Sequence, residues 1–503
     1  MPICSTIPQQ LAFNAAHHGD DIWLTSPETS QSYSWSQAYE AASQIASALL
    51  SKGVGMGETV ALAAPNSLGA TLSFIAITMT GGRATPINLV AGVKVMAYVL
   101  AHSKTNKIIV DDDYIELISQ AIEASGRDIE MIRLDRELGA ECEDDRSCEL
   151  PSLSADDPAL LIYTSGTTGN PKGVLLSHKN LLSAGENVAI AHQLSSQDKG
   201  LCVLPIYHIN GLAVTVMGTL VSHSGLVMPY RFSNSRFWQE ILDYHCSWFS
   251  AVPTLFTYIL NEDKTPDLST SQLRFARSAS APLPPEIHRK FEQRFGVPII
   301  ETMGLTETGA QILSNPLPPM MRKIGSPGIA MGNEVKIIHP ETEADLPPNS
   351  EGEIVVRGAN VMLGYLDQPE ATAKSFTSDG WLKSGDLGKM DDDGFIFVTG
   401  RIKELIIKGG ENIAPREIDE VLLEHEAVLE AAAFARPCDN YGQTVEACIR
   451  LKDGYQVEQS DLLDHCHARL GAFKSPDIVH VLDDLPKGPS GKVQRLKLIE
   501  LVD

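Results

Sequence analysis

Short apolar, β-branched runs alternate along the chain with stretches in which apolar residues recur at helical spacing. Residues 59–64 and 107–110 are such apolar runs, and each predicts a buried strand. Residues 34–52 show the helical spacing, and Ser34 followed three positions later by Gln37 predicts a capping box at the start of this helix. Because strands and helices alternate repeatedly, we expect parallel sheets in an α/β fold.

The pattern changes in the last third of the chain. Strands are expected at residues 335–338 and 352–357, and the acidic segment 391–394, which ends in glycine, predicts a hairpin turn. The C-terminal segment then has a helix–strand–helix pattern of its own and the length of a small domain. We therefore expect a large N-terminal region of α/β sheet subdomains, residues 1–400, and a small, mobile α+β C-terminal domain, residues 401–503.

Composition and charge narrow the classes of function. Hydrophobic residues make up 43% of the chain and charged residues 21%, which is typical of a globular protein and excludes a mostly disordered one. The net charge of −24 repels phosphate backbones and anionic lipids, so we expect no nucleic-acid partner. The most apolar stretch, residues 212–229, is interrupted by His223, so no membrane insertion is expected.

Cysteine spacing and the N-terminus bear on the compartment. The eight cysteines show no CxxC spacing, which argues against a zinc or redox site. The first residues lack a charged start followed by an apolar run, so they predict no signal peptide. Both features predict a cytoplasmic protein whose thiols are reduced.

Residues 161–174 carry more chemical information than any other segment. An apolar run leads into six small or hydroxylated residues, and Lys172 follows three positions later. Backbone N–H groups of small residues can approach a polyanion closely, hydroxyls add donors, and the lysine adds a positive charge, as in a phosphate-binding loop. Pro171 stands where the P-loop of NTPases has glycine, and a glycine-rich surface loop has the same composition. The six residues are Thr164, Ser165, Gly166, Thr167, Thr168 and Gly169.

This segment resembles the phosphate-loop signature of the adenylate-forming, or AMP-binding, superfamily, which contains acyl-CoA ligases, carrier-loading adenylation domains and luciferases. Further stretches resemble the superfamily's motifs in the same order, and the likeness spans roughly residues 10 to 500. These stretches are residues 303–307, 384–386, 400–404, 409–411 and 489–492. Other stretches look like the oxalate–CoA ligase branch, namely residues 231–233, 248–254, 275–280 and 314–318.

The resemblance implies a two-step reaction that uses ATP, Mg²⁺ and coenzyme A. In the first step, a carboxylate attacks the α-phosphate of ATP and gives an acyl-adenylate and pyrophosphate. In the second step, the thiol of coenzyme A displaces AMP and gives a thioester. Both steps spread negative charge in the transition state, so fixed cations and N–H donors are expected to dominate catalysis.

The resemblance also assigns roles around the nucleotide. Residues 164–169 and Lys172 match the loop that wraps the β- and γ-phosphates, Thr306 matches the hydroxyl at the α-phosphate, and Glu307 matches the carboxylate that holds Mg²⁺. Taken alone, Glu307 also fits an acidic residue that stabilises the start of a helix. Asp386 also fits a residue that caps a turn. The residues assigned to adenine and ribose are Ser280, Ala281, Pro282, Glu301, Thr302, Met303, Asp386 and Arg401. The family usually has an aromatic residue where Met303 stands, which puts the adenine contact in doubt.

Residues on the C-terminal domain are expected to act in turn. Lys492 matches the catalytic lysine of adenylation, which reaches the carboxylate and the α-phosphate only when the domains close, although a solvated lysine is the plainer reading. Lys403 matches the hinge residue about which the domain rotates between the two steps. Gly409 and Gly410 match the segment that then gives the thiol arm access.

The acyl site is expected near four residues, His208, Asn210, Arg277 and Gly304. His208 also fits a buried histidine whose hydrogen bonds are all made within the core. Residues 204–217 contain no aspartate that would pair with the ammonium of an α-amino acid, which disfavours amino-acid activation. Together with the oxalate–CoA ligase likeness, this favours a short, polar or dianionic carboxylate held by His208, Asn210 or Arg277.

Three classes of function remain open from the sequence. The first is an acid–CoA ligase, for which a medium- or long-chain fatty acid is the alternative substrate. The second is a stand-alone adenylation enzyme that loads an acyl or amino acyl group onto the thiol of a carrier protein. The third, a non-catalytic nucleotide-binding protein, is disfavoured because the residues assigned to catalysis are intact.

Overall fold

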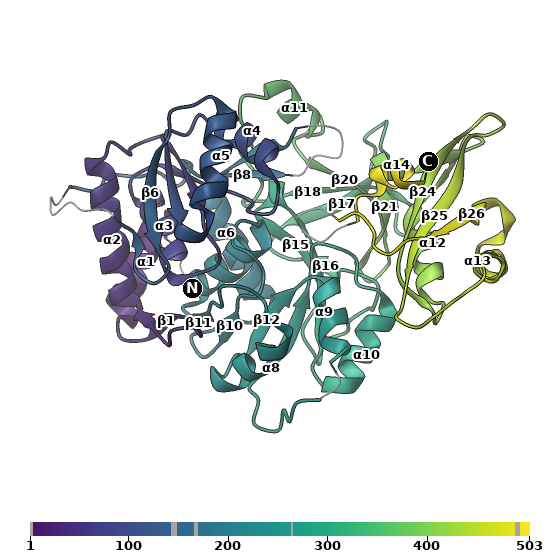
Figure 1. Cartoon of the computed structure of the whole chain (residues 1–503), viewed down its shortest axis with the longest axis horizontal. Coiled ribbons are helices and arrows are strands. Elements are labelled where there is room, and N and C mark those ends of the chain that lie inside the picture. Colours follow the sequence, from purple (N-terminus) through teal and green to yellow (C-terminus); the bar gives the residue numbers. More distant parts are fainter. Residues whose placement is uncertain (1–3, 142–147, 165–169, 263–264, 488–492, 503) are drawn as a thin grey trace.

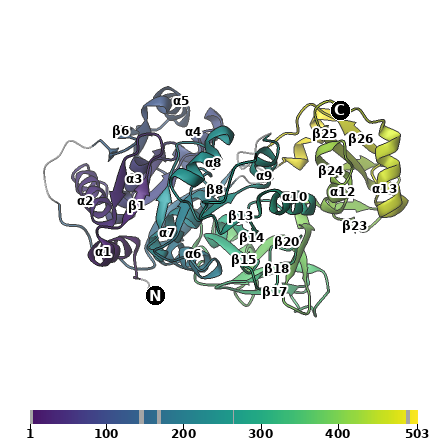
Figure 2. The same cartoon turned by 90° about the horizontal axis from the view of Figure 1, so that it is seen from below.

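The computed structural model describes residues 4–502 apart from 142–147, 165–169, 263–264 and 488–492. A large N-terminal region holds three sheets, and a smaller C-terminal domain holds a fourth. Figure 1 shows the C-terminal domain in green and yellow beside the large region, and Figure 2 shows that it adjoins the large region at one end. The mixed α/β class expected from the sequence is confirmed.

The first sheet has eight strands in the order β19-β9-β8-β4-β3-β5-β6-β7. Its central strands run parallel, as the alternation of strands and helices predicted, and the strands expected at 59–64 and 107–110 are β3 and β5. Helices α3 (Leu68–Met79), α4 (Val93–His102) and α5 (Ile115–Ser125) connect these strands. The strands are β3 (Thr59–Ala63), β4 (Arg83–Pro86), β5 (Lys107–Asp111), β6 (Glu130–Asp135), β7 (Gly139–Ala140), β8 (Pro158–Thr164), β9 (Lys172–Ser177) and β19 (Gly364–Tyr365).

The second sheet has nine strands in the order β16-β15-β14-β13-β12-β10-β11-β1-β2. Its strands are β1 (Ile22–Thr25), β2 (Ser32–Ser34), β10 (Lys199–Leu201), β11 (Gly225–Val227), β12 (Trp248–Ala251), β13 (Phe275–Ser278), β14 (Ile299–Leu305), β15 (Ala310–Ser314) and β16 (Ile329–Ala330). The helices around it are α1 (Ile7–His18), α2 (Trp35–Ser51), α6 (His178–Ala191), α7 (Gly218–Ser222), α8 (Asn234–Asp243), α9 (Pro253–Leu260) and α10 (Pro285–Phe295).

Helices α2 and α3 show how local sequence and burial agree. Helix α2 begins with the predicted capping box, in which Ser34 accepts from the backbone of Gln37 and Gln37 accepts from the backbone of Ser34. Every residue of α3 is buried, because this helix packs against α1 and α2 on one side and against strands of the first sheet on the other. A helix covered on all sides needs no polar face, and α3 is apolar apart from Thr71, Ser73 and Thr78.

The third sheet is antiparallel and consists of β17 (Glu334–Ile338), β18 (Gly352–Arg357), β20 (Leu382–Met390) and β21 (Ile396–Arg401), with α11 (Pro369–Lys374) preceding β20. The expected strands at 335–338 and 352–357 and the hairpin turn are confirmed. In that turn, Asp391 Oδ1 accepts from the backbone N–H groups of Asp393 (3.0 Å) and Phe395 (2.9 Å).

The C-terminal domain is built on β22 (Ile406–Lys408), β23 (Glu411–Ile413), β24 (Val428–Cys438), β25 (Gly442–Leu451) and β26 (Ile478–Val481). Helices α12 (Pro415–Leu423) and α13 (Gln459–Lys474) help form its separate apolar core, and α14 (Ile499–Val502) lies near its end. The short 3₁₀ turn Ile402–Glu404 connects β21 to this domain. The boundary expected between residues 400 and 401 remains a prediction.

No helix in the part of the chain that the structure describes is long and apolar enough to cross a membrane. The apolar stretch 212–229 instead forms most of a π-helix, Asn210–Met217, followed by α7 and β11. Both helices are wholly buried, so the apolar character of this stretch reflects burial in the protein core.

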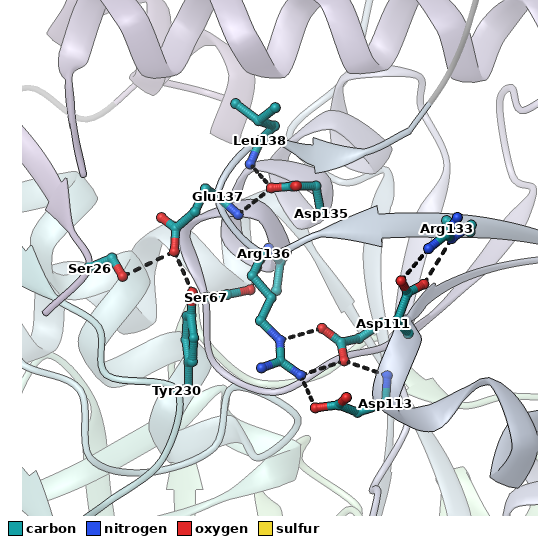
Figure 3. Close-up of polar contacts among 12 residues, drawn as sticks. Ser26, Ser67, Asp111, Asp113, Arg133, Asp135, Arg136, Glu137, Leu138 and Tyr230 are labelled. Carbon is teal, nitrogen blue, oxygen red and sulfur yellow. Dashed lines mark hydrogen bonds and ion pairs between the residues drawn. The ribbon is translucent and has the colours of Figure 1, made fainter. Parts of the chain in front are cut away.

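A polar cluster joins the first sheet to the second (Figure 3). Between β6 and β7, Arg136 donates to Asp111 at 2.6 and 2.7 Å and lies over the ring of Tyr230, which follows β11. The Tyr230 hydroxyl donates to Glu137 Oε1 at 2.5 Å. Asp111 is almost fully buried, so its charge depends on Arg136 for compensation.

We expect Arg136→Met to lower the stability of the large region by roughly 2–3 kcal/mol, because it leaves the buried Asp111 carboxylate unpaired. The matched control is Arg133→Met, which breaks an exposed pair with Asp112 and should cost about 0–1 kcal/mol. Thermal unfolding followed by circular dichroism measures both. Equal midpoints for the two variants would contradict the role given to Arg136.

Candidate active site

The candidate phosphate loop lies between two paired strands. Thr164 ends β8 and Lys172 begins β9, and the antiparallel register places these two residues opposite each other. Ser165, Gly166, Thr167, Thr168 and Gly169 lie outside the described residues. The hairpin therefore fixes both ends of the segment to which the resemblance assigns the phosphates.

Lys172 and Glu307 meet at a tyrosine that the sequence analysis did not single out. The ammonium of Lys172 lies 4.5 Å from the ring centroid of Tyr365 in β19, and the Tyr365 hydroxyl donates to Glu307 Oε1 at 2.9 Å. Burial, and then the negative charge of Glu307, raise the pKa of Tyr365, so the phenol stays protonated and remains a donor. Glu307 and Thr306 lie in the 3₁₀ turn Thr306–Thr308, directly after β14.

Asp386 and Arg401 are brought together by the register of β20 and β21. Arg401 Nε donates to Asp386 Oδ1 at 2.6 Å, and Asp386 is buried. The negative charge of Asp386 raises the pKa of Arg401, and Glu307 contributes in the same direction. The pair predicted to hold the ribose is thus in contact, although its role remains a prediction.

The residues assigned to adenine lie on β14 and on the loop after β13. Glu301 and Thr302 are buried, and Glu301 Oε1 accepts from the backbone N–H of Leu283 at 3.3 Å. Burial raises the pKa of the Glu301 carboxyl. Met303 is partly buried against the core. Ser280, Ala281 and Pro282 form the loop between β13 and α10, where Ser280 has a positive φ of 72°.

His208 lies at a narrow cavity of about 60 Å³ that also reaches Thr164 and Pro171. Tyr163, Tyr207 and residues of α4 and the segment before it, most of them apolar, line the rest of this cavity. His208 is therefore near the start of the candidate phosphate loop, as expected of a residue at the acyl site. Asn210 begins the π-helix that follows, and irregular helices of this kind often accompany functional sites.

Arg277 is the most unusual residue of the candidate site. It lies in the middle of β13, is only 1% exposed, and has no carboxylate within ion-pairing distance among the described residues. Its Nη1 donates to Asn210 Oδ1 (3.2 Å) and Ser250 Oγ (3.0 Å), and its Nε and Nη2 donate to Gln311 Oε1 (3.3 and 3.2 Å). Burial alone lowers the pKa of Arg277, to about 9, so the guanidinium remains charged at neutral pH.

Gly304 lies beside this cluster, because the register of β14 and β15 pairs it with Gln311. A Cβ atom at position 304 would lie 1.7 Å from the backbone oxygen of Ala310, so this position accepts only glycine. Asn210 Nδ2 donates to Ser280 Oγ at 3.1 Å. The structure therefore connects Asn210 and Arg277, both expected at the acyl site, to the loop expected at the adenine.

The expected residues of the C-terminal domain are only partly described. Lys403 is exposed in the 3₁₀ turn between the two regions. Gly409 and Gly410 form the turn between β22 and β23, both with positive φ. Lys492 lies outside the described residues. In this arrangement Arg416 of α12 donates to the backbone oxygen of Val398 at 2.7 Å, which joins the domain to β21.

Glu307 fits the Mg²⁺ ligand that the resemblance implies. Its Oε1 accepts from Tyr365, and its Oε2 makes no hydrogen bond to any residue that the structure describes. The residues that the structure describes contain no group of three or more histidine, cysteine or acidic side chains that could hold a metal by themselves. A Mg²⁺ ion would therefore share Glu307 with phosphate oxygens of ATP, which is a common arrangement for this ion.

Tyr365, Ser250 and Gln311 were missed by the sequence analysis. Tyr365 lies in a two-residue strand, Ser250 in a short buried strand, and Gln311 three residues after the Thr306–Thr308 turn. Gln311 interrupts the buried, largely apolar strand β15, and a polar residue inside a buried strand is the signal that the sequence offered.

Family profiles match most of the chain. The profile of AMP-binding enzymes matches residues 11–366, and that of the AMP-binding enzyme C-terminal domain matches residues 417–492. These matches confirm the predicted resemblance to the adenylate-forming superfamily.

Curated relatives and solved structures agree with the profiles. The chain is 42% identical to the sulfoacetate–CoA ligase of Cupriavidus necator, over 99% of this chain and 98% of the relative. It is 34% identical to the oxalate–CoA ligase of Arabidopsis thaliana, over 88% of each. The structure matches that of ATP-bound MatB from Rhodopseudomonas palustris with a TM-score of 0.91 and 27% identity, over 99% of each chain. The chain therefore belongs to the AMP-binding enzyme family, as an acid–thiol ligase of the AMP-forming acyl-CoA synthetase type.

Proposed function

We propose that this enzyme activates a short carboxylic acid that carries a second anionic group, and transfers the resulting acyl group to coenzyme A. ATP is the second substrate, pyrophosphate leaves in the first step, and AMP leaves in the second. The observation that carries the proposal is the buried, charged Arg277 with no carboxylate partner among the described residues.

Leaving a guanidinium charge buried without a counter-ion is costly, and neutral hydrogen-bond acceptors offset only part of that cost. Buried charges in proteins are normally paired, so an unpaired one in a candidate site points to a ligand of opposite charge. A carboxylate or sulfonate on the substrate would supply the missing negative charge, whereas an alkyl chain would not. The position of Arg277 beside Asn210, near Gly304 and the Ser280 loop, supports placing that group at the acyl site.

The names of two relatives support the same substrate class. Sulfoacetate and oxalate, the acids in the names of the relatives in Cupriavidus necator and Arabidopsis thaliana, are both short and doubly charged. A medium- or long-chain fatty acid would place apolar carbons against a buried charge, so it is the weaker alternative.

In the proposed first step, cations and N–H donors of the chain hold the triphosphate. Residues 164–169 and Lys172 bind the β- and γ-phosphates, Thr306 binds the α-phosphate, and Asp386 with Arg401 orients the ribose. The ring of Tyr365 fixes the position of Lys172, and its hydroxyl fixes the carboxylate of Glu307. A Mg²⁺ ion at Glu307 would neutralise phosphate charge when bound.

In the proposed second step, the C-terminal domain rotates at Lys403, which withdraws Lys492 and brings Gly409 and Gly410 to the thiol arm. We expect that arm to approach near His208 and Thr164, which line one cavity. A carrier-protein thiol is the alternative acceptor. Formation of the acyl-CoA thioester without any carrier protein distinguishes the two.

The substrate proposal predicts a preference among acids. Pyrophosphate release should be faster with sulfoacetate or oxalate than with propionate or octanoate. Arg277→Met should lower kcat/KM for the doubly charged acids on the order of 100-fold, because a charged contact worth a few kcal/mol is lost. The control is Arg289→Met, which removes an exposed charge on α10. Turnover only with medium or long acyl chains would refute the proposal.

The role of Lys492 predicts a split between the two half-reactions. Lys492→Ala should reduce acyl-adenylate formation by at least about 100-fold while ATP still binds, because only the transition-state contact is lost. Thioester formation from a supplied acyl-adenylate should be nearly unchanged. Lys497→Ala, which removes an exposed lysine nearby, is the control. Equal loss of both half-reactions in Lys492→Ala would rule out this division of roles.

A further inference from the structure

Gln311 accepts hydrogen bonds from one edge of the Arg277 guanidinium. Its side chain is fully buried in β15, and its Oε1 accepts from both Nε and Nη2 of Arg277, at 3.3 and 3.2 Å. Its Nε2 donates to the backbone oxygen of Asn187 in α6 at 3.3 Å. This second bond fixes the amide so that its oxygen, and not its nitrogen, faces the guanidinium.

The other edge of the guanidinium is fixed by a closed triangle. Arg277 Nη1 donates to Ser250 Oγ and Asn210 Oδ1, and Ser250 Oγ donates to the same Asn210 oxygen at 2.9 Å. The strand register places Ser250 directly beside Arg277. A guanidinium has five N–H donors, so these bonds use four and leave one on Nη2 without an acceptor among the described residues.

Every acceptor around Arg277 is therefore neutral. His192 is completely buried, and burial and then the nearby Arg277 lower its pKa well below the usual range, so it stays neutral and adds no second positive charge. Neutral amides and hydroxyls fix the direction of the guanidinium without cancelling its charge. An acid at the position of Gln311 would do both.

We propose that Gln311 is the positioning residue that sets the specificity of this enzyme for doubly charged acids: it orients Arg277 through an amide oxygen and leaves the positive charge for the substrate. This inference rests on the substrate class proposed above and assigns its control to a residue that need not touch the substrate. Glutamine and glutamate have nearly the same shape and differ in one charge. In this proposal, that charge at position 311 decides the specificity.

The test is Gln311→Glu, measured as kcat and KM for sulfoacetate and for propionate. The new carboxylate pairs with Arg277, so kcat/KM for sulfoacetate relative to propionate should fall on the order of 100-fold, mostly through the KM for sulfoacetate. The KM for ATP should be nearly unchanged. ATP should still raise the midpoint of thermal unfolding, which shows that the variant is folded, and sulfoacetate should no longer raise it.

A second variant separates charge from shape. Gln311→Met removes the amide acceptor but adds no charge, so Arg277 stays positive although less firmly oriented. We expect its KM for both acids to rise by roughly 10-fold or less and its preference for sulfoacetate to persist. If Gln311→Glu does not fold, Gln311→Met decides alone, because loss of that preference in it overturns the inference. Gln37→Glu, which adds the same charge at the exposed start of α2, is the control.

The outcomes separate this inference from the proposed function. If the wild-type enzyme does not prefer doubly charged acids, the proposed substrate class fails. If the wild type prefers them and Gln311→Glu leaves the preference unchanged, only the inference about Gln311 fails. Equal changes of preference in Gln311→Glu and Gln311→Met would also overturn it, because the effect would then come from packing and not from charge.

Discussion

A positive charge buried inside the nine-stranded sheet constrains the proposed acyl site more than any other feature. Arg277 is held there by β12, β15 and the π-helix, each of which supplies a neutral acceptor. The guanidinium needs hydrogen-bond acceptors on two of its edges. Each of these acceptors has to be neutral, because a carboxylate in its place would cancel the positive charge that the site offers to a ligand. The close contact of Gly304 with Ala310 belongs to the same constraint, since it sets the spacing of β14 and β15 beside Gln311.

Elsewhere, partly buried arginines are paired with acids. Arg136 binds Asp111, Arg401 binds Asp386, and Arg495 binds Asp419. The protein carries a net charge of −24, so acids are abundant, and the lack of one beside Arg277 among the described residues is informative. The same surplus of acids repels anions from most of the surface, so in the proposed function a few fixed cations in one site hold ATP and the doubly charged acid.

Local patterns predicted most of the fold. The capping box of α2, the individual strands β3 and β5 and the hairpin turn at 391–394 depend on residues close in sequence, and each is confirmed. The contacts of the site depend instead on distant residues. Tyr365 reaches Glu307 across 58 positions, and Arg277 reaches Gln311 across 34. Sequence reasoning named Arg277 from its branch likeness, but only the packing of three strands and the π-helix reveals that its partners are neutral.

The C-terminal domain carries the residues assigned to both steps, so its connection to the large region matters as much as the acyl site. Arg495 follows residue 492 by three positions and donates to Asp419 of α12 at 2.6 Å and to Glu404 at 3.4 Å. Glu404 ends the 3₁₀ turn that contains Lys403. Because this network joins the segment after Lys492 to α12 and to the turn, we expect the domain to rotate as one body about the residues before Glu404, and Lys492 to leave the site whenever Gly409 and Gly410 approach it.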